Sequence, residues 1–282
     1  MEIHSVSAQN KQFANLSTFA IDRQVDDYLE SKHFIGSPFF AILVTAGYLW
    51  LVLRFLPRFM TSRKPYAPST FIALYNLSQI IYNAYLCYLY VKMLNWKSLT
   101  IWENTCHPVS AANNFDPAIN IKMAEFEYYY YVNKIYDFTD TILFSLRKKT
   151  SQVTFLHVYH HCVMVPFMWI TLFKLREEMT VVMLFLNTTI HVIMYVYYFL
   201  SNLGPAVQKF LWWKKYITLL QMLQFIAILS LFAKLNLEGC KSSPYFTLIW
   251  TFITSSFVVL FTHFYTNTYK KKTEVPFLQK SN

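Results

Sequence analysis

The chain has 282 residues, of which 55% are hydrophobic, 19% aromatic and only 14% charged. A soluble globular protein carries about 25% charged residues, so this composition excludes a water-soluble protein of this size. The formal net charge is +10, but the basic residues lie between long apolar runs and form no soluble basic domain, which argues against nucleic acid as a partner. We therefore expect an all-α polytopic membrane protein surrounded by the lipid bilayer.

Seven runs are long enough to cross the apolar core of a membrane, which takes about 20 residues of helix. They cover residues 37–57, 69–91, 124–146, 154–173, 179–200, 215–234 and 244–268. The chain is thus expected to hold a seven-helix membrane domain (37–268) between a polar N-terminal segment (1–36) and a basic tail (269–282). The N-terminal segment lacks a charged-then-apolar leader, so we expect the first membrane helix to direct insertion.

Lysine and arginine predict the orientation, because they favour the cytosolic side of a membrane. One set of segments holds 14 basic residues and a single acid: 54–68, 147–153, 201–215 and 269–282. The segments on the other side hold 10 basic and 12 acidic residues. We therefore place the N-terminus in the lumen and the basic tail in the cytosol.

The four cysteines divide by the same assignment. Cys87 and Cys162 lie in predicted membrane helices as small apolar residues. Cys106 and Cys240 both fall in loops assigned to the lumen, where disulfides form. We expect a disulfide between them, and a free, reactive thiol at either position is the alternative. Asn15 in NLS is a candidate glycan acceptor in the lumenal segment.

Polar side chains gather at one depth of the predicted bundle. Such groups are costly inside a membrane and are candidates for function. At about 1.5 Å of rise per residue, those on four helices lie about 5–20 Å from the cytosolic ends, and the lumenal half has almost none. This distribution predicts a site entered from the cytosol, with an apolar region beyond it. The candidates are Lys134, Asp137, Asp140, His157, His160, His161, Asn187, His191, Gln221 and Gln224.

The stretch KIYDFTDT puts Lys134, Asp137 and Thr141 on one helical face, with Asp140 beside them. One interpretation is internal pairing, in which Lys134 neutralises Asp137 and Asp140 contacts a histidine or Arg147. The other is that Asp137 or Asp140 orients a histidine and sets its tautomer. The sequence leaves both interpretations open.

The stretch TFLHVYHH places three histidines at i, i+3 and i+4, on one face of a helix. Membrane di-iron enzymes use such boxes, but they need several of them, and here His4, His33 and His107 are assigned to the lumenal side. A single zinc held by three histidines and an aspartate is an alternative, yet we expect no catalytic metal and no cofactor. Imidazole alone serves as general base, general acid or nucleophile. The thiol of Cys162 is an alternative nucleophile, although it is expected to point away from His160.

Four motifs, in order along the chain, resemble those of the very-long-chain fatty acid elongases: KIYDFTDT, FLHVYHH, HVIMYVYY and QMLQF. The resemblance covers about residues 37–270. It implies a multi-pass acyltransferase of the endoplasmic reticulum membrane that condenses a long-chain acyl-CoA with malonyl-CoA. The products are a 3-oxoacyl-CoA, CoA and carbon dioxide. It also implies the other enzymes of the elongation cycle as partners (a ketoacyl reductase, a dehydratase and an enoyl reductase), and a homo- or hetero-oligomer.

The resemblance also implies roles for particular residues. It makes His157, His160 and His161 the HxxHH box, His191, Met194 and Tyr195 the HxxMY motif, and Gln221 and Gln224 the QxxQ motif. We expect His160 or His191 to take the acyl group or to activate the malonyl thioester, with His157 and His161 positioning them. The tautomer would be held by Asp137 or Asp140. Hydrogen bonds to the developing oxyanion or enolate would come from Asn187, Tyr195 or the glutamines.

A basic cytosolic mouth suits the phosphates of CoA, and the apolar lumenal half suits an acyl chain. We assign substrate binding to the mouth and, deeper, to Lys134; the mouth residues are Arg147, Lys148, Lys149, Lys214 and Lys215. Three departures from the family pattern stand out. Asp137 occupies a position that is usually Glu, FKLREEMT lacks the usual glycines, and only Lys280 remains of a dilysine retrieval signal. A histidine-box lipid oxidase or desaturase and a seven-helix receptor or transporter are the alternative functions.

Overall fold

The computed structural model describes residues 23–32, 34–94, 106, 118–240 and 242–270. Within these ranges all regular structure is helical and no strand occurs. A short helix at residues 23–30 comes first, and short 3-10 or π segments of the chain are labelled η. The later elements are α2 (Pro38–Trp50), η1 (Leu51–Phe55), α3 (Leu56–Met60), α4 (Ser69–Leu94), α7 (Ala118–Tyr136), α8 (Phe138–Leu146), η2 (Thr150–Gln152), α9 (Phe155–Ile170), η3 (Thr171–Leu175), α10 (Met179–Asn202), α11 (Pro205–Gln208), α12 (Lys214–Leu237), α13 (Pro244–Tyr265) and η4 (Thr266–Lys270).

These elements join into seven long rods, because η1 and α3 continue α2, α8 continues α7, η3 continues α9, and η4 continues α13. Among the described residues, five stretches are long and apolar enough to cross a membrane: Pro38–Met60, Phe155–Leu175, Met179–Asn202, Lys214–Leu237 and Pro244–Tyr269. The expected all-helical, polytopic membrane character is therefore confirmed. The other two rods, α4 and α7–α8, carry more polar residues, so the count of seven crossings stays a prediction.

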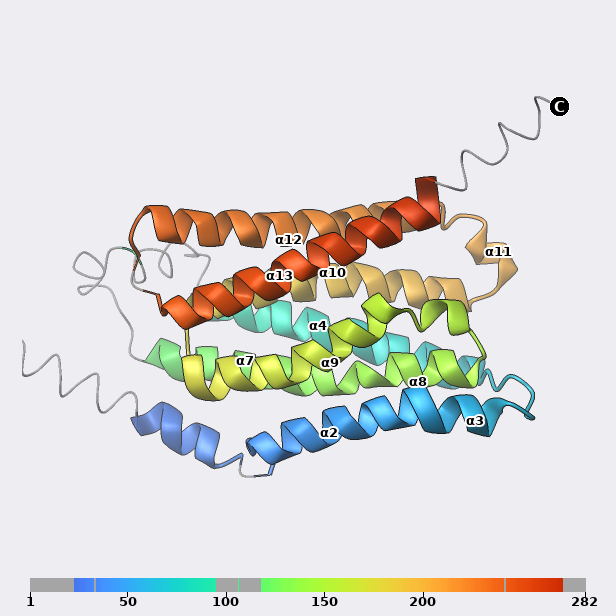
Figure 1. Ribbon diagram of the computed structural model, residues 1–282, viewed down its shortest axis with the longest axis horizontal. Coiled ribbons are helices and arrows are strands. Elements are labelled where there is room, and N and C mark those ends of the chain that lie inside the picture. The colour runs from blue at the N-terminus through green and yellow to red at the C-terminus, as the bar shows by residue number, and fades with distance from the viewer. Residues whose placement is uncertain (1–22, 33, 95–105, 107–117, 241, 271–282) are drawn as a thin grey trace, which may run out of the picture.

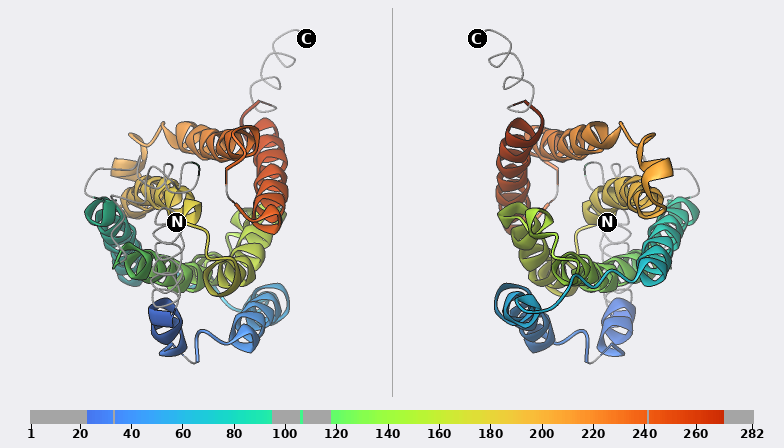
Figure 2. Two further views of the ribbon diagram at one scale, coloured as in Figure 1. Left: turned by 90° about the vertical axis from the view of Figure 1, so that its left-hand side faces the viewer. Right: turned by 90° about the vertical axis from the view of Figure 1, so that its right-hand side faces the viewer.

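Six of the rods form a closed ring (Figure 2). Going round it, α10 contacts α4, α4 contacts α7, α7 contacts α9, α9 contacts α13, α13 contacts α12, and α12 returns to α10. The rod that starts with α2 lies outside the ring and packs on α9. A ring of six helices encloses an interior, and the side chains that fill or line this interior decide what the protein does.

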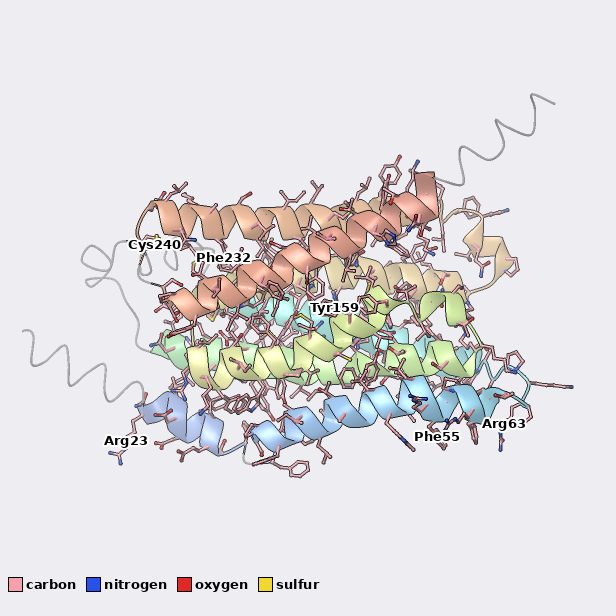
Figure 3. All side chains as sticks on the ribbon, viewed as in Figure 1. Arg23, Phe55, Arg63, Tyr159, Phe232 and Cys240 are labelled. Atoms are coloured by element: carbon pink, nitrogen blue, oxygen red, sulfur yellow. A yellow bond between two sulfur atoms is a disulfide. The ribbon has the colours of Figure 1, made fainter. Side chains whose placement is uncertain are left out.

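The two ends of the ring differ in composition. The basic end, to the right in Figure 1, consists of α3, the α8–α9 connection and α11, and holds the described lysines and arginines that the charge pattern assigns to the cytosol. The disulfide end, to the left, holds a disulfide between Cys106 and Cys240 (Figure 3). At this same end Arg176 and Asp26 form an ion pair of 2.6 Å. Asn15 and Lys280 lie outside the described residues.

The half of the ring nearest the disulfide end is filled with side chains. The exposed fraction is 0% for Met168 and Phe246 and 1% for Met183 and Phe232, so no water-sized space touches them. This half is largely apolar, as predicted, although its buried side chains include Glu127 of α7 and Thr180 of α10. It is a packed core and not an open volume. A void there would forfeit the dispersion contacts that close packing provides.

Candidate functional site

A cavity of about 890 Å³ opens at the basic end and runs into the ring. All six rods of the ring contribute residues to its walls. The α7–α8 rod contributes only from the junction at Asp137 onward. Thirteen of the predicted site residues line it: Asp137, Asp140, Arg147, Lys149, His157, His160, His161, Asn187, His191, Tyr195, Lys214, Gln221 and Gln224. Motifs that are far apart in the sequence therefore meet in one space.

Three predicted site residues lie elsewhere. Lys134 is buried behind the cavity wall, with 1% of its side chain exposed. Lys148 points toward α3, where its Nζ donates to the carbonyl of Thr61 at 3.4 Å, beside a separate hollow of about 280 Å³. Lys215 lies over the ring of Tyr216, 5.0 Å from its centroid. Fewer basic residues line the mouth than predicted, because neighbouring side chains on a helix or turn point in different directions.

The predicted pairing of Lys134 with Asp137 is confirmed. Asp137 lies where α7 ends and α8 begins, and Lys134 Nζ donates to its Oδ2 at 2.7 Å. The other oxygen, Oδ1, accepts from Gln79 Nε2 at 2.8 Å and from the hydroxyl of Tyr195 at 3.1 Å. A buried ion pair is tolerated only when further hydrogen bonds satisfy its remaining atoms, and here both carboxylate oxygens are engaged.

His191 faces the lysine of this pair rather than its carboxylate. Its Nδ1 lies 3.5 Å from Lys134 Nζ and 3.9 Å from Asp137 Oδ2. An ammonium group only donates hydrogen bonds, so the Nδ1 that faces it is the unprotonated nitrogen, and the proton sits on Nε2. Lys134 thus lies between the carboxylate of Asp137 and the imidazole of His191, and its ammonium favours one tautomer of that imidazole.

Asp140 has a different partner from those expected. The hydroxyl of Tyr195 donates to its Oδ2 at 2.6 Å, so the interpretation that Asp140 contacts a histidine or Arg147 is wrong. The same hydroxyl reaches Asp137, and one hydrogen is thus shared by two carboxylates on adjacent turns. Both acids lie at the start of α8 within reach of Tyr195 on α10, and this hydroxyl is the partner of Asp140 in place of a histidine or Arg147.

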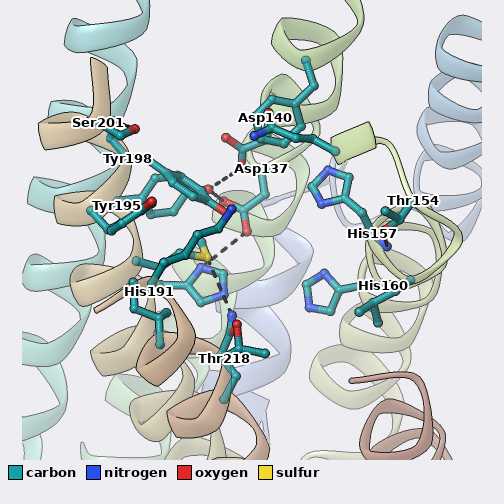
Figure 4. A pocket seen from close by; sticks show the side chains of 18 of the residues that line it. Asp137, Asp140, Thr154, His157, His160, His191, Tyr195, Tyr198, Ser201 and Thr218 are labelled. Atoms are coloured by element: carbon teal, nitrogen blue, oxygen red, sulfur yellow. Dashed lines mark hydrogen bonds and ion pairs between the residues drawn. The ribbon is translucent and has the colours of Figure 1, made fainter. Parts of the chain in front are cut away.

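The three histidines of α9 differ in their surroundings. Thr154 caps the helix by accepting from the backbone N–H of His157 at 3.2 Å. The Nε2 of His157 shares a hydrogen bond of 2.8 Å with Thr141 Oγ1. His161 lies between the other two, with ring centroids 4.5 Å from His157 and 5.2 Å from His160. Figure 4 shows His157 and His160 pointing from α9 toward His191 on the opposite wall.

His160 is the histidine with the fewest constraints. In the part of the chain that the structure describes, it makes ring contacts, including one of 5.3 Å with Phe257, and no hydrogen bond. Its side chain is partly exposed, and it lines the cavity. Its imidazole is therefore open to a substrate.

Amide groups line the same space. Asn187 accepts from the hydroxyl of Tyr130 at 2.7 Å, which leaves its NH₂ group as the donor for a ligand. Gln221 Nε2 lies 3.8 Å from the sulfur of Met194, and Gln224 is buried in the wall. These donors face a space where a carbonyl or enolate oxygen could be stabilised.

The contribution of α4 was not predicted from the sequence. Asn133 Nδ2 donates to Asn83 Oδ1 at 3.1 Å, and Asn83 Nδ2 donates to Gln79 Oε1 at 3.2 Å. This chain of amides ends on Asp137 and supports it from behind. The signal was present in NLSQIIYN, where Asn76, Gln79 and Asn83 recur at helical spacing inside an apolar run.

The mouth of the cavity concentrates positive charge. Arg147, Lys149 and Lys214 line it, and the acids in the wall, Asp137 and Asp140, lie deeper. Partial burial lowers the pKa of the Arg147 guanidinium. The pKa of the Lys149 ammonium is also lowered, first by partial burial and then by the charges of Arg147 and Lys214. Among the described residues these three cations form no ion pair with an acid, and like charges held together in this way suit a polyanionic ligand.

Comparison with known proteins gives a consistent result. Residues 33–276 match the model of the GNS1/SUR4 (ELO) family. The chain is 33% identical to very long chain fatty acid elongase 1 of Mus musculus, over 90% of each chain. It is 33% identical to elongase 7 of Rattus norvegicus, over 90% of this chain and 89% of that protein. For elongase 4 of Homo sapiens the identity is 32%, over 87% and 76%. With its ordered motifs gathered around one cavity, the chain belongs to the GNS1/SUR4 family.

Proposed function

We propose that this protein is an acyltransferase that catalyses the condensation step of fatty acid elongation. A long-chain acyl-CoA loses its C–S bond, and malonyl-CoA loses its carboxylate as carbon dioxide. A new C–C bond joins the two fragments into a 3-oxoacyl-CoA, while the released CoA thiolate takes up one proton. Family membership and the chemistry of the cavity support this function.

One observation carries the proposal. Histidines from α9 and α10 face each other across a single cavity whose entrance is basic and whose interior offers amide donors. The entrance suits the phosphates of CoA, and opposed imidazoles suit the transfer of an acyl group between two CoA esters. A receptor or transporter does not need this combination of groups.

The geometry suggests a division of roles between two histidines. His160 is open to substrate and takes the acyl group, which breaks the thioester and forms an N-acyl imidazole. His191, whose Nε2 carries the proton, donates a hydrogen bond to the enolate oxygen that forms when the malonyl group loses carbon dioxide. The enolate carbon then attacks the acyl carbon and releases the imidazole of His160.

Lys134 and Asp137 act in this scheme as positioning residues. Their pair holds the tautomer of His191, and Tyr195 fixes the orientation of both Asp137 and Asp140. Asn187 and Gln221 line the wall near these groups and are donors for a thioester oxygen. His157 and His161 position the ring of His160.

We infer a seven-crossing arrangement in the endoplasmic reticulum membrane, with the basic end in the cytosol and the N-terminus in the lumen. Disulfides form in oxidising compartments, and Cys106–Cys240 lies at the end opposite the basic segments. A cytosolic entrance receives CoA esters and returns a product that a ketoacyl reductase, a dehydratase and an enoyl reductase would process. These enzymes are the proposed partners, and homo- or hetero-oligomers are included in the proposal.

The test is a condensation assay with purified protein, radiolabelled malonyl-CoA and a panel of acyl-CoA esters. We expect labelled 3-oxoacyl-CoA with one equivalent each of carbon dioxide and free CoA, and no inhibition by metal chelators. A folded protein that gives no labelled product with any ester of the panel would contradict the proposal. An oxidised lipid product that tracks bound iron would favour the histidine-box oxidase instead.

A further inference from the structure

A hollow of about 280 Å³ lies between the rod that starts with α2 and the turn that joins α8 to α9. Figure 1 shows this region at the basic end, where α3 lies beside α8. The lining residues are Val52, Pro57, Met60, Thr61, Ser145, Lys148, Thr150 and Val153. None of them lines the large cavity, so the hollow belongs to the outer side of the ring and is separate from the candidate site.

The turn between α8 and α9 has two faces. Arg147, Lys149 and Gln152 line the large cavity, whereas Lys148 and Thr150 line the hollow. A ligand in the hollow would therefore contact this turn from the side opposite the entrance of the cavity.

Lys148 follows α8 in a backbone conformation that usually requires glycine. Its φ is +56°, in the left-handed region. The backbone N–H of Lys148 donates to the carbonyl of Ser145 at 3.1 Å. The next N–H, of Lys149, donates to the carbonyl of Phe144 at 2.9 Å, and the two bonds together form a Schellman cap. A Cβ is costly at this position, so the presence of a lysine points to a role for its side chain.

The side chain of Lys148 brings positive charge to the hollow. Its Nζ lies 3.4 Å from the carbonyl of Thr61, which is long for a hydrogen bond, and within the described ranges it forms no ion pair. The two segments around the hollow, 54–68 and 145–153, contain no acid and the following basic residues: Arg54, Arg58, Arg63, Lys64, Arg147, Lys148 and Lys149. An anion beside Lys148 would therefore meet only positive charge.

The rest of the hollow suits a lipid better than a hydrated ion. Val52 and Met60 are buried apolar side chains, and Pro57 lies between them on the same wall. This wall forms the end of the stretch Pro38–Met60, which is long and apolar enough to cross a membrane, so it lies at the level of the lipid headgroups. Leu53 on the same rod is 52% exposed and offers apolar surface to an acyl chain. A free hydrated anion gains nothing from such a wall, whereas the glycerol and upper acyl carbons of a phospholipid do.

We propose that the hollow binds an anionic phospholipid from the leaflet that meets the basic end. The phosphate lies at the ammonium of Lys148, the glycerol occupies the apolar hollow, and an acyl chain follows the outer rod past Leu53. Basic pockets between membrane helices recognise anionic headgroups in this way. The site shares no lining residue with the large cavity, so it does not depend on the proposed function.

Two changes at Lys148 separate its charge from its backbone. Lys148→Gly removes the ammonium and places the favoured residue at the left-handed position, so this variant should fold at least as well as the wild type. We expect it to bind phosphatidylserine about fivefold more weakly, because one basic residue near a membrane surface contributes about that much. Lys148→Arg keeps the charge and should retain binding.

Two further variants test the hollow itself. Val153→Trp puts a bulky ring into the hollow without changing the charge, and it should also weaken the binding of phosphatidylserine. Lys215→Ala is the matched control, because it removes a lysine at the same end of the ring. Lys215 lies over the ring of Tyr216 and outside the hollow, so this variant should bind like the wild type.

Native mass spectrometry of the full-length protein in detergent measures bound lipid, with phosphatidylserine or phosphatidylcholine added and no CoA ester present. The wild type should retain phosphatidylserine in preference to phosphatidylcholine. Equal retention of the two lipids, unchanged binding in folded Lys148→Gly or Val153→Trp, or an equal loss in Lys215→Ala would overturn the proposal. Inorganic phosphate alone should protect the wild type from heating less than phosphatidylserine does. Equal protection would make the occupant a soluble anion and would also overturn the proposal.

Discussion

The two halves of the helix ring solve different physical problems. The half at the basic end keeps an open cavity, buries a lysine, two aspartates and two histidines around it, and leaves two further histidines partly exposed on its wall. The half at the disulfide end excludes water and holds apolar side chains at close packing. Buried charges cost stability unless they are paired, and close packing with a covalent link supplies stability. The comparison suggests that the closed half stabilises the ring and thereby allows the open half to hold a costly site.

Replacement of a cavity histidine should give the largest effect on function. We expect His160→Ala and His191→Ala each to abolish condensation, because the first removes the proposed nucleophile and the second the proposed enolate donor. The rate of labelled 3-oxoacyl-CoA formation in microsomes measures this. His263, exposed near the end of α13, provides the matched control, and His263→Ala should turn over normally. Normal turnover in both cavity variants would contradict the catalytic roles proposed for His160 and His191.

The buried ion pair should give the largest effect on stability. Lys134→Met leaves Asp137 as an uncompensated buried carboxylate, which typically costs about 3–5 kcal/mol. We expect the thermal midpoint of Lys134→Met to fall well below that of the wild type in detergent, measured by size-exclusion chromatography after heating.

The double variant Lys134→Met with Asp137→Leu separates charge from packing. Removing both partners of a buried pair costs less than removing one, so the double variant should be more stable than the single one. It should still lack activity, since nothing then holds the tautomer of His191. A double variant that is both stable and fully active would remove Lys134 and Asp137 from the mechanism.

The sequence predicted the helices, and the candidate residues that share one cavity, for particular physical reasons. Apolar runs of about 20 residues locate membrane helices. Polar residues inside such runs are conspicuous, which is why most of the candidates proved to line the same cavity. The sequence did not predict the direction in which individual side chains point. Lys148 and Lys215 are indistinguishable from Lys149 and Lys214 by charge, yet they point away from the cavity.

Contacts between helices that are far apart in the sequence could not be predicted either. The position of Lys134 between Asp137 and His191 depends on how α7 packs beside α10, and no local pattern encodes that distance. The aromatic part of the cavity wall is another example, because the chain has 26 phenylalanines and only the packing of the helices brings Phe225 and Phe261 to that wall. The amides of α4 did have a visible pattern, and the same depth argument applied to that run would have found them.

The disulfide should contribute stability without contributing to the chemistry. Cys106 and Cys240 are 134 residues apart, and cross-links that close long loops typically stabilise by about 2–4 kcal/mol. We expect Cys106→Ala to lower the thermal midpoint while condensation at low temperature stays near wild type. Cys87→Ala, at a free cysteine, is the control and should change neither. Loss of activity in Cys106→Ala at a temperature where the protein is folded would contradict the separation between the two halves.

The smallest effects should come from the mouth of the cavity, where Lys149 lines the entrance and Lys215 does not. Exposed charge interactions contribute up to about 1 kcal/mol, so we expect Lys149→Ala to raise KM for acyl-CoA about three- to fivefold with kcat unchanged. Lys215→Ala should leave KM as it is. Added salt should narrow the difference, because it screens the phosphates.

The pH dependence of KM tests the same entrance. The pKa of Lys149 is lowered by partial burial and by its basic neighbours, so this ammonium loses its proton at a lower pH than an ordinary lysine. Loss of that charge weakens attraction for the CoA phosphates, and KM should therefore rise as the pH is increased on the alkaline side. In Lys149→Ala the rise should be smaller, because the titrating group is gone. Equal alkaline rises in the wild type and in Lys149→Ala would mean that the entrance does not use this lysine, and would shift the recognition of CoA to Arg147 and Lys214.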